Sequence, residues 1–141
     1  MPKKQNKILI TGALGHIGAS LIRNINENLA SEVLLLDNLE SRRFPSLYNL
    51  PKKKYKYRFI HDDIMTADFD KHLKGVSVVI HLAAITDAEG SHKIPEKVEK
   101  VNYGGLQRVA DACLKNKVKI LFPSTTSVYG SQASVVDETC K

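Results

Sequence analysis

The residues with the clearest chemical signal are three glycines, which lie in the segment Thr-Gly-Ala-Leu-Gly-His-Ile-Gly of residues 11–18. They follow an apolar run and open a segment with helical spacing, and this order is typical of a dinucleotide-binding turn. Gly12 would turn the chain sharply, Gly15 would let the backbone approach a pyrophosphate, and Gly18 would allow close packing of the helix on the sheet. Phosphates would then lie at the helix N-terminus, where free N–H groups favour anions.

Two carboxylates follow at the ends of predicted strands. Asp37 lies about twenty residues beyond the glycines, where it can accept hydrogen bonds from ribose hydroxyls and repel a 2′-phosphate. This favours NAD over NADP, although Arg42 and Arg43 nearby offer cations to such a phosphate. Asp63 is placed to reach an adenine amino group, because Asp68 can cap the next helix and leave Asp63 free for the ligand. The alternative role for each carboxylate is a turn or cap residue.

Further polar and small residues fall near the ends of later strands. Ala83 and Ala84 would let a cofactor pass close to the fourth strand, whereas His81 fits better as a hydrogen-bonded core histidine than as a base. Asn102 interrupts an apolar helix face, so it is either a structural clamp or a residue near the active site. A cluster of hydroxyl residues at 124–127 follows the fifth strand, which is where a doubly wound fold carries chemistry.

The elements that position these residues alternate between apolar runs and helical patterns. Strands are predicted at residues 8–10, 33–36, 58–61, 76–82 and 118–122. Helices are predicted at residues 16–30, 69–73 and 95–116. The apolar stripe of the first helix is predicted to comprise Ile17, Leu21, Ile22, Ile25 and Leu29. That of the last helix is predicted to comprise Val98, Val101, Leu106, Val109, Ala110, Cys113 and Leu114, with Gly104 and Gly105 allowing close approach.

This order predicts an α/β fold, a Rossmann-type doubly wound parallel sheet with helices on both faces. The chain of 141 residues is expected to be one domain, residues 1–141, truncated after the fifth strand. The outer edge of the fifth strand would then be exposed, and such an edge invites a second copy or a complementing chain to pair with it.

Composition excludes several other classes of protein. The chain is 43% hydrophobic and 26% charged, as globular proteins are, and its apolar runs are too short to span a membrane. Its two cysteines lack metal-ligand spacing, and with no signal peptide visible they favour the cytoplasm. The net charge of +6 owes much to residues 52–58, which we interpret as a solvated surface segment. Steering of an anionic nucleotide or nucleic-acid binding are the alternatives, and the latter ranks lowest.

Six segments together resemble a known family, in the same order along the chain. They are Thr-Gly-Ala-Leu-Gly-His-Ile-Gly at 11–18, Leu-Asp-Asn-Leu at 36–39, Asp-Asp-Ile at 62–64, His-Leu-Ala-Ala at 81–84, Val-Asn-Tyr-Gly-Gly at 101–105 and Ser-Thr-Thr-Ser-Val-Tyr-Gly at 124–130. The chain is similar to the N-terminal part of the extended short-chain dehydrogenases/reductases, in the NAD-dependent epimerase/dehydratase group. UDP-glucose 4-epimerase and nucleotide-sugar dehydratases are familiar members of that group.

The resemblance implies a role for each matching position. His16 and Ile17 would supply backbone N–H groups to the pyrophosphate, beside Gly12, Gly15 and Gly18. The remaining cofactor contacts would come from Asp37 and Asn38 at the ribose, Asp63 and Ile64 at the adenine, and Leu82, Ala83 and Ala84 at the central riboses. Asn102 would support the active site. Thr125 occupies the family's catalytic Ser/Thr position, and Ser124 is the alternative if the register differs by one residue.

One part of the family's pattern is missing from the sequence. Members of the family use a tyrosine as acid/base with a lysine four residues later, about two dozen residues beyond the Val-Tyr-Gly segment, and the sequence ends at Lys141 before that point. The literal match from Tyr48 to Lys52 is rejected, because Pro51 would break the helix that aligns the two side chains. We therefore expect the chain to be inactive alone.

The resemblance implies an NAD-binding part of a nucleotide-sugar epimerase or dehydratase, with transient hydride transfer between NAD and a sugar carbon. The expected substrate is a nucleotide sugar, with no metal, no membrane and no nucleic acid. The alternatives are another extended short-chain reductase or dehydrogenase, and a non-catalytic dinucleotide-binding module, for which the missing Tyr–Lys pair is natural.

Overall fold

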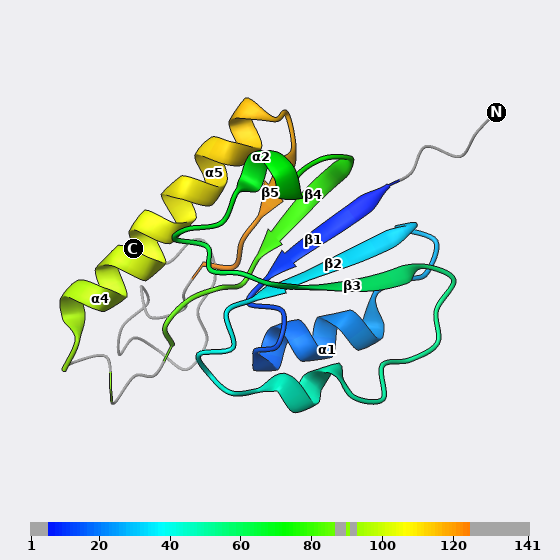
Figure 1. Cartoon of the computed structure of the whole chain (residues 1–141), viewed down its shortest axis with the longest axis horizontal. Helices are drawn as coiled ribbons and strands as arrows, with labels where there is room; N and C mark the ends of the chain where they lie inside the picture. The colour runs from blue at the N-terminus through cyan, green and yellow to red at the C-terminus, as the bar shows by residue number, and fades with distance from the viewer. Residues whose placement is uncertain (1–5, 87–89, 91–92, 125–141) are drawn as a thin grey trace, which may run out of the picture.

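The central feature of the molecule is a parallel sheet of five strands in the order β3-β2-β1-β4-β5. The computed structural model describes residues 6–86, 90 and 93–124. The strands are β1 (Lys7–Thr11), β2 (Glu32–Asp37), β3 (Lys56–His61), β4 (Val76–His81) and β5 (Lys119–Leu121). Because β1 lies between β2 and β4 (Figure 1), the chain reverses direction of winding there, which confirms the predicted doubly wound sheet.

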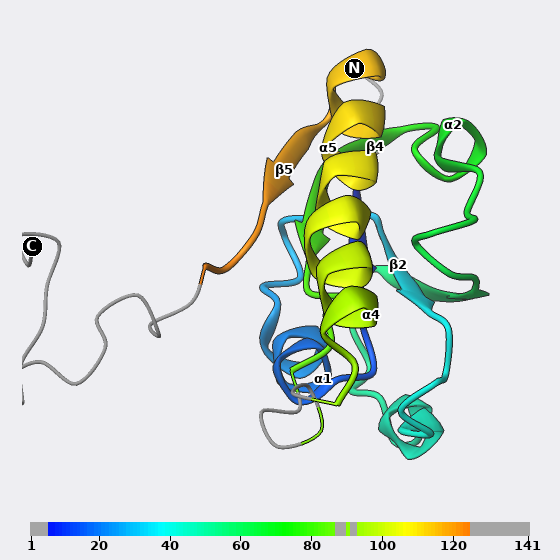
Figure 2. The same cartoon turned by 90° about the vertical axis from the view of Figure 1, so that its left-hand side faces the viewer.

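Helices cover both faces of this sheet. They are α1 (His16–Asn24), η1 (a 3-10 turn, Phe44–Leu47), α2 (Phe69–His72), α4 (Pro95–Glu99), η2 (a π-helical turn, Lys100–Gly104) and α5 (Gly105–Lys115). Figure 1 shows α1 on one side of the sheet and α5 on the other. Figure 2 shows that α4, η2 and α5 form one continuous rod, which confirms the helix predicted over residues 95–116.

The alternation of side chains along the central strand divides the core into two halves. Leu9 belongs to the cluster beneath α2 and α5, which includes Val109 and Cys113. Ile8 and Ile10 belong to the cluster beneath α1. Since both faces of every central strand are buried, the continuous apolar runs in the sequence are explained by helices on each face.

The first helix is shorter than predicted. It ends at Asn24 and not near Ala30, because Ile25 at the C-cap is extended, with φ −56° and ψ 129°. Beyond it, the Asn26 side-chain oxygen accepts a hydrogen bond from the Asn28 backbone N–H at 2.9 Å. Asparagine side chains compete for backbone groups in this way and favour turns over helix interiors.

The predicted apolar stripes were also partly wrong. Ile17 and Leu29 are 64% and 58% exposed, contrary to the prediction, whereas Ile22 and Ile25 of the predicted stripe are buried. On α5, Val109 and Cys113 are buried as predicted, whereas Leu114 is 80% exposed. Because a helix advances 100° per residue, neighbouring apolar residues in a long run cannot all face one sheet.

The basic segment before β3 is a surface segment with one inward side chain. Tyr55 is buried and its hydroxyl donates to the Ile22 carbonyl at 3.4 Å, while Lys52, Lys54 and Lys56 are exposed. The strand begins at Lys56, two residues earlier than predicted, since the alternation of exposed and inward side chains already starts there.

The described residues include no helix long and apolar enough to cross a membrane. Across the same part of the chain, no group of three or more His, Cys, Asp or Glu side chains is arranged to hold a metal ion. Cys113 is a free, buried thiol whose pKa is raised by burial.

Candidate functional site

The glycine turn between β1 and α1 is fixed by close backbone contacts. Gly12 has a φ of +63°, and a Cβ there would lie 2.6 Å from the Ala83 backbone nitrogen. The Gly15 N–H donates to the Gly12 carbonyl at 3.1 Å, which closes the turn. Only glycine satisfies both the left-handed backbone and the contact with the segment after β4, as the sequence predicted for a sharp turn.

The start of α1 presses against the same turn. A Cβ on Gly18 would lie 2.5 Å from the Ala13 carbonyl oxygen, so this glycine brings the helix onto the turn rather than onto the sheet as predicted. Gly15 is the N-cap residue, no side chain caps the helix, and its first turn holds no acidic residue. His16 and Ile17 are exposed here. An uncapped, exposed helix start is a favourable place for an anion.

Asp37 joins the end of β2 to the glycine turn. Its Oδ2 accepts a hydrogen bond from the Leu14 N–H at 3.0 Å, and its Oδ1 accepts one from the Leu39 N–H at 2.9 Å. The side chain therefore also has the turn-forming role that was the alternative for it. A carboxylate has about four acceptor positions, so these two bonds leave capacity for ribose hydroxyls.

Asp63 is not free, contrary to the prediction. Its Oδ1 accepts from the Met65 N–H at 2.8 Å, and its Oδ2 accepts from the Asn38 side-chain amide at 2.9 Å. Asp68 does cap α2, by accepting from the Lys71 N–H at 3.1 Å, as predicted. An aspartate that directly follows a strand orders its own turn by such local bonds, whatever else it binds.

A hydrogen-bond network links the ends of β1 and β4. The Thr11 hydroxyl oxygen accepts from the N–H groups of Leu82 and Ala83, at 3.2 and 3.3 Å. With both lone pairs used, its proton is directed to His81 Nδ1, 2.7 Å away. His81 is therefore neutral with its proton on Nε2, and burial lowers its pKa to about 4. The prediction of a hydrogen-bonded core histidine is confirmed.

Asn102 clamps the segment that follows β4. Its amide donates to the Ile85 carbonyl at 3.0 Å, and its side-chain oxygen accepts from the Ile85 N–H at 2.7 Å. The residue lies in the π-helical turn η2, an irregularity often found at functional sites. Of the two roles considered for Asn102, the structure shows the clamp.

Of the paired glycines that follow, only one makes a close approach. A Cβ on Gly105 would lie 2.6 Å from Ile64 Cδ1, whereas one on Gly104 would meet nothing within 4 Å. The prediction of close approach is therefore confirmed for Gly105 alone. Ile64 itself is buried, at 5% exposure.

The structure gathers most of the predicted residues at the carboxyl edge of the sheet. Leu82, Ala83 and Ala84 follow β4 directly, and Ala84 is exposed. Ser124 is exposed a short way beyond β5, and Thr125 lies outside the described residues. Two residues that support this edge were not predicted from the sequence. Thr11 opens the glycine segment but was given no role there. Arg108 lies on the surface of α5, and its side chain donates to the carbonyls of Ile64 and Ala67.

These residues fit a dinucleotide. The turn packs too closely on neighbouring backbone for a Cβ at Gly12 or Gly18. The helix start beyond it has no side-chain cap, and Asp37 lies at the end of the adjacent strand. Backbone N–H donors and a carboxylate acceptor thus lie together where the strand order reverses, an arrangement suited to a phosphate and a ribose. Fold and turn together define a Rossmann-type α/β domain.

Comparisons with known proteins identify the family. The profile of the "NAD dependent epimerase/dehydratase family" matches residues 8–141, and the chain belongs to that family. It is 34% identical over 141 residues to the "Uncharacterized UDP-glucose epimerase YtcB" of Bacillus subtilis, covering 94% of this chain and 44% of that protein. It is 32% identical over 132 residues to the dTDP-D-glucose 4,6-dehydratase of Dictyostelium discoideum, covering 89% of this chain and 30% of that protein.

Solved structures agree with this assignment. The UDP-N-acetylglucosamine 4-epimerase of Methanobrevibacter ruminantium, in complex with UDP-N-acetylmuramic acid, has a TM-score of 0.82 at 30% identity, covering 96% of this chain and 43% of that one. The UDP-glucuronic acid 4-epimerase of Bacillus cereus, in complex with UDP-glucuronic acid and NAD, has a TM-score of 0.76 at 32% identity, covering 94% and 44%. The chain thus spans less than half the length of these relatives.

Proposed function

We propose that this chain is the NAD-binding part of a nucleotide-sugar epimerase or dehydratase. The observation that carries the proposal is the Asp37 carboxylate, which holds Leu14 of the glycine turn while standing at the end of β2. One side chain thereby couples the phosphate-binding turn to a ribose position. NAD in the B. cereus epimerase supports the choice of cofactor.

The other residues take roles along the same edge. The N–H groups at His16 and Ile17 would face the pyrophosphate, with Gly12, Gly15 and Gly18 making room for it. Asn38 would join Asp37 at the ribose, and Asp63 with Ile64 would meet the adenine. Leu82, Ala83 and Ala84 would line the central riboses, and Asn102 would hold the Ile85 segment in place.

The reaction proposed for the full enzyme is reversible hydride transfer, for which bound NAD supplies the acceptor. Thr125, or Ser124 in the alternative register, would donate a hydrogen bond to the sugar oxygen as its charge develops. The nucleotide-sugar ligands of the two solved epimerases support this substrate class.

Binding by isothermal titration tests the cofactor assignment. We expect the chain to bind NAD at least about tenfold more tightly than NADP, because the Asp37 carboxylate repels a 2′-phosphate. Asp37→Ala should weaken NAD binding and narrow that ratio. Asp68→Ala is the matched control, since it removes a carboxylate that caps α2 and should leave both affinities unchanged. Tighter binding of NADP, or binding of neither dinucleotide, would contradict the proposal.

The exposed edge of the sheet is the basis of a second proposal. Within the described residues β5 pairs only with β4. Leu121 at its end and Phe122 directly after it are 59% and 53% exposed. We propose that a second copy or a complementing chain covers this edge. A monodisperse monomer in light scattering, with one cooperative thermal transition, would argue against it.

A further inference from the structure

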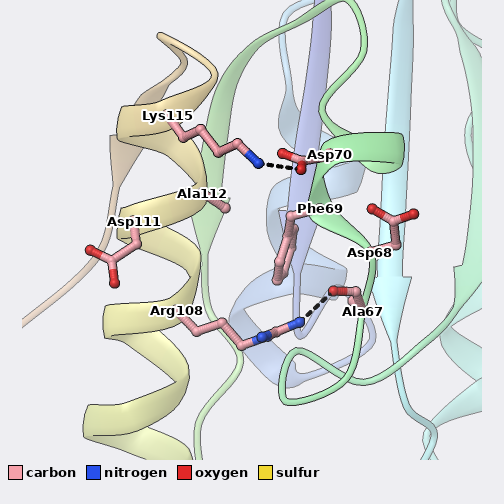
Figure 3. A pocket seen from close by; sticks show the side chains of 8 residues that line it. All are labelled: Ala67, Asp68, Phe69, Asp70, Arg108, Asp111, Ala112 and Lys115. Carbon is pink, nitrogen blue, oxygen red and sulfur yellow. Dashed lines mark hydrogen bonds and ion pairs between the residues drawn. The ribbon is translucent and has the colours of Figure 1, made fainter.

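Arg108 connects α5 to the turn that follows β3. Its Nε donates to the Ile64 carbonyl at 3.1 Å and its Nη2 donates to the Ala67 carbonyl at 2.8 Å. Figure 3 shows the side chain reaching from α5 to Ala67 across a groove of roughly 230 Å³. A planar guanidinium that binds two carbonyls of one turn fixes both its distance and its orientation.

The same helix holds this turn at a second point. Gly105 lies three residues before Arg108, on the same face of α5. The tip of the Ile64 side chain rests against it, in the space a Cβ would need. Ile64 is therefore held through its side chain by Gly105 and through its carbonyl by Arg108.

The turn itself is compact and carries the residues proposed to meet adenine. The Asp63 carbonyl accepts from the N–H groups of Thr66 and Ala67, at 3.0 and 2.7 Å. On its other side, the Asp63 carboxylate is tied to the Asn38 amide at the end of β2. Since these internal bonds make the turn move as one unit, its position is set by its outer contacts, among them Arg108.

We propose that Arg108 is a positioning residue for base recognition, which sets the Asp63–Ile64 backbone at the distance that the adenine ring requires. The inference rests on the proposed function, because it assumes that NAD binds at this edge. Arg108 contacts no ligand in this proposal and acts through the turn. Lysine could not replace it fully, since an ammonium lacks the planar fork that spans two carbonyls.

The test compares two dinucleotides that differ only in the base. NAD carries an exocyclic amino group where nicotinamide hypoxanthine dinucleotide carries a carbonyl, so the ratio of their affinities reports how well the turn reads the base. We expect Arg108→Met to weaken NAD binding about tenfold, as the loss of one hydrogen bond between the displaced turn and adenine would, and to weaken hypoxanthine dinucleotide binding much less. Arg108→Lys should fall between wild type and Arg108→Met.

Lys115→Met is the matched control. Lys115 lies in the same groove and on the same helix, but it pairs with Asp70 of α2 and not with the turn (Figure 3). Lys115→Met should therefore leave the affinities for NAD and for the hypoxanthine dinucleotide unchanged. Hydrogen exchange of residues 62–67 without ligand should rise in Arg108→Met and stay unchanged in Lys115→Met.

The outcomes separate this inference from the proposed function. If Arg108→Met weakens both dinucleotides equally, the residue only stabilises the fold, and the inference is overturned while NAD binding stands. If the wild-type chain binds neither dinucleotide, the proposed function fails and the inference fails with it. If Arg108→Met does not fold, as judged by circular dichroism, Arg108→Lys decides: an unchanged affinity ratio overturns the inference, and a reduced ratio supports it.

Discussion

Replacement of Gly12 by alanine should destabilise the chain more than replacement of a glycine that has a positive φ but space for a Cβ, such as Gly75. The left-handed φ of +63° costs an alanine about 1–2 kcal/mol. The new Cβ would also lie 2.6–2.8 Å from backbone atoms of Leu82 and Ala83, which no rotamer change can relieve. Overpacking of this kind adds about 1–3 kcal/mol, so we expect a loss of about 3 kcal/mol in the free energy of unfolding.

Two other glycines supply matched controls. Gly75 has a similar φ of +77°, but a Cβ there would make only an ordinary 3.5 Å contact with the Lys7 side chain. Gly75→Ala should therefore cost about 1 kcal/mol, the backbone strain less the entropy lost by the unfolded chain. Gly104 is helical with nothing within 4 Å, and Gly104→Ala should stabilise by about 0.5–1 kcal/mol.

The assay is urea unfolding followed by circular dichroism, with the m-value checked for each variant. A domain of this size has a free energy of unfolding of about 5–15 kcal/mol, so a loss of about 3 kcal/mol remains measurable. The reasoning is refuted if Gly12→Ala costs no more than Gly75→Ala, because the contact with the segment after β4 would then be without energetic consequence.

Three further predictions follow from single hydrogen-bonded groups. The His81 pKa is lowered to about 4, below its ordinary 6.5, so stability should fall as the pH drops from about 6.5 to about 4, by at most about 1.4 kcal/mol per pH unit; His81→Asn should flatten this dependence in urea titrations across pH. Asn102→Ala should cost about 2–3 kcal/mol, since it leaves a backbone N–H and a carbonyl unpaired, whereas Asn24→Ala on the exposed face of α1 should cost little. The hydrogen bond from His72 lowers the Asp62 pKa. The stability that this bond contributes is therefore fully present above the ordinary carboxyl pKa and is lost as the pH falls through the lowered Asp62 pKa. His72→Ala should raise the Asp62 pKa measured by NMR.

The sequence predicted β1 and β2 well, because both strands are buried on both faces and therefore read as unbroken apolar runs. It also placed Asp37 at the end of a strand, about twenty residues beyond the glycine turn, and the structure has it at the end of β2. Helix ends were predicted less well. Just beyond the end of α1, the Asn26 side chain accepts a hydrogen bond from the Asn28 backbone N–H, and a periodic pattern does not reveal this bond.

Contacts between distant segments account for the features that the sequence did not predict. Nothing near Asn102 in the sequence indicates that its partner is Ile85, and nothing near Asp63 indicates that Asn38 lies within hydrogen-bond distance. Arg108 reads as an exposed cation on a helix until the fold brings the carbonyls of Ile64 and Ala67 beside it. Periodicity predicts elements, whereas these pairings depend on the topology.

The central position of β1 has a consequence for the order in which the chain folds. Lys7 of β1 pairs with Glu32 on one side but with Val76 on the other. Because closing a longer loop costs more entropy, the β1–α1–β2–β3 unit should assemble early, and β4 should add late. The hydrogen bond between Thr11 and His81, 70 residues apart, then forms only when β4 docks. During synthesis the glycine turn would therefore gain its contact with Leu82 and Ala83 only after β4 has emerged.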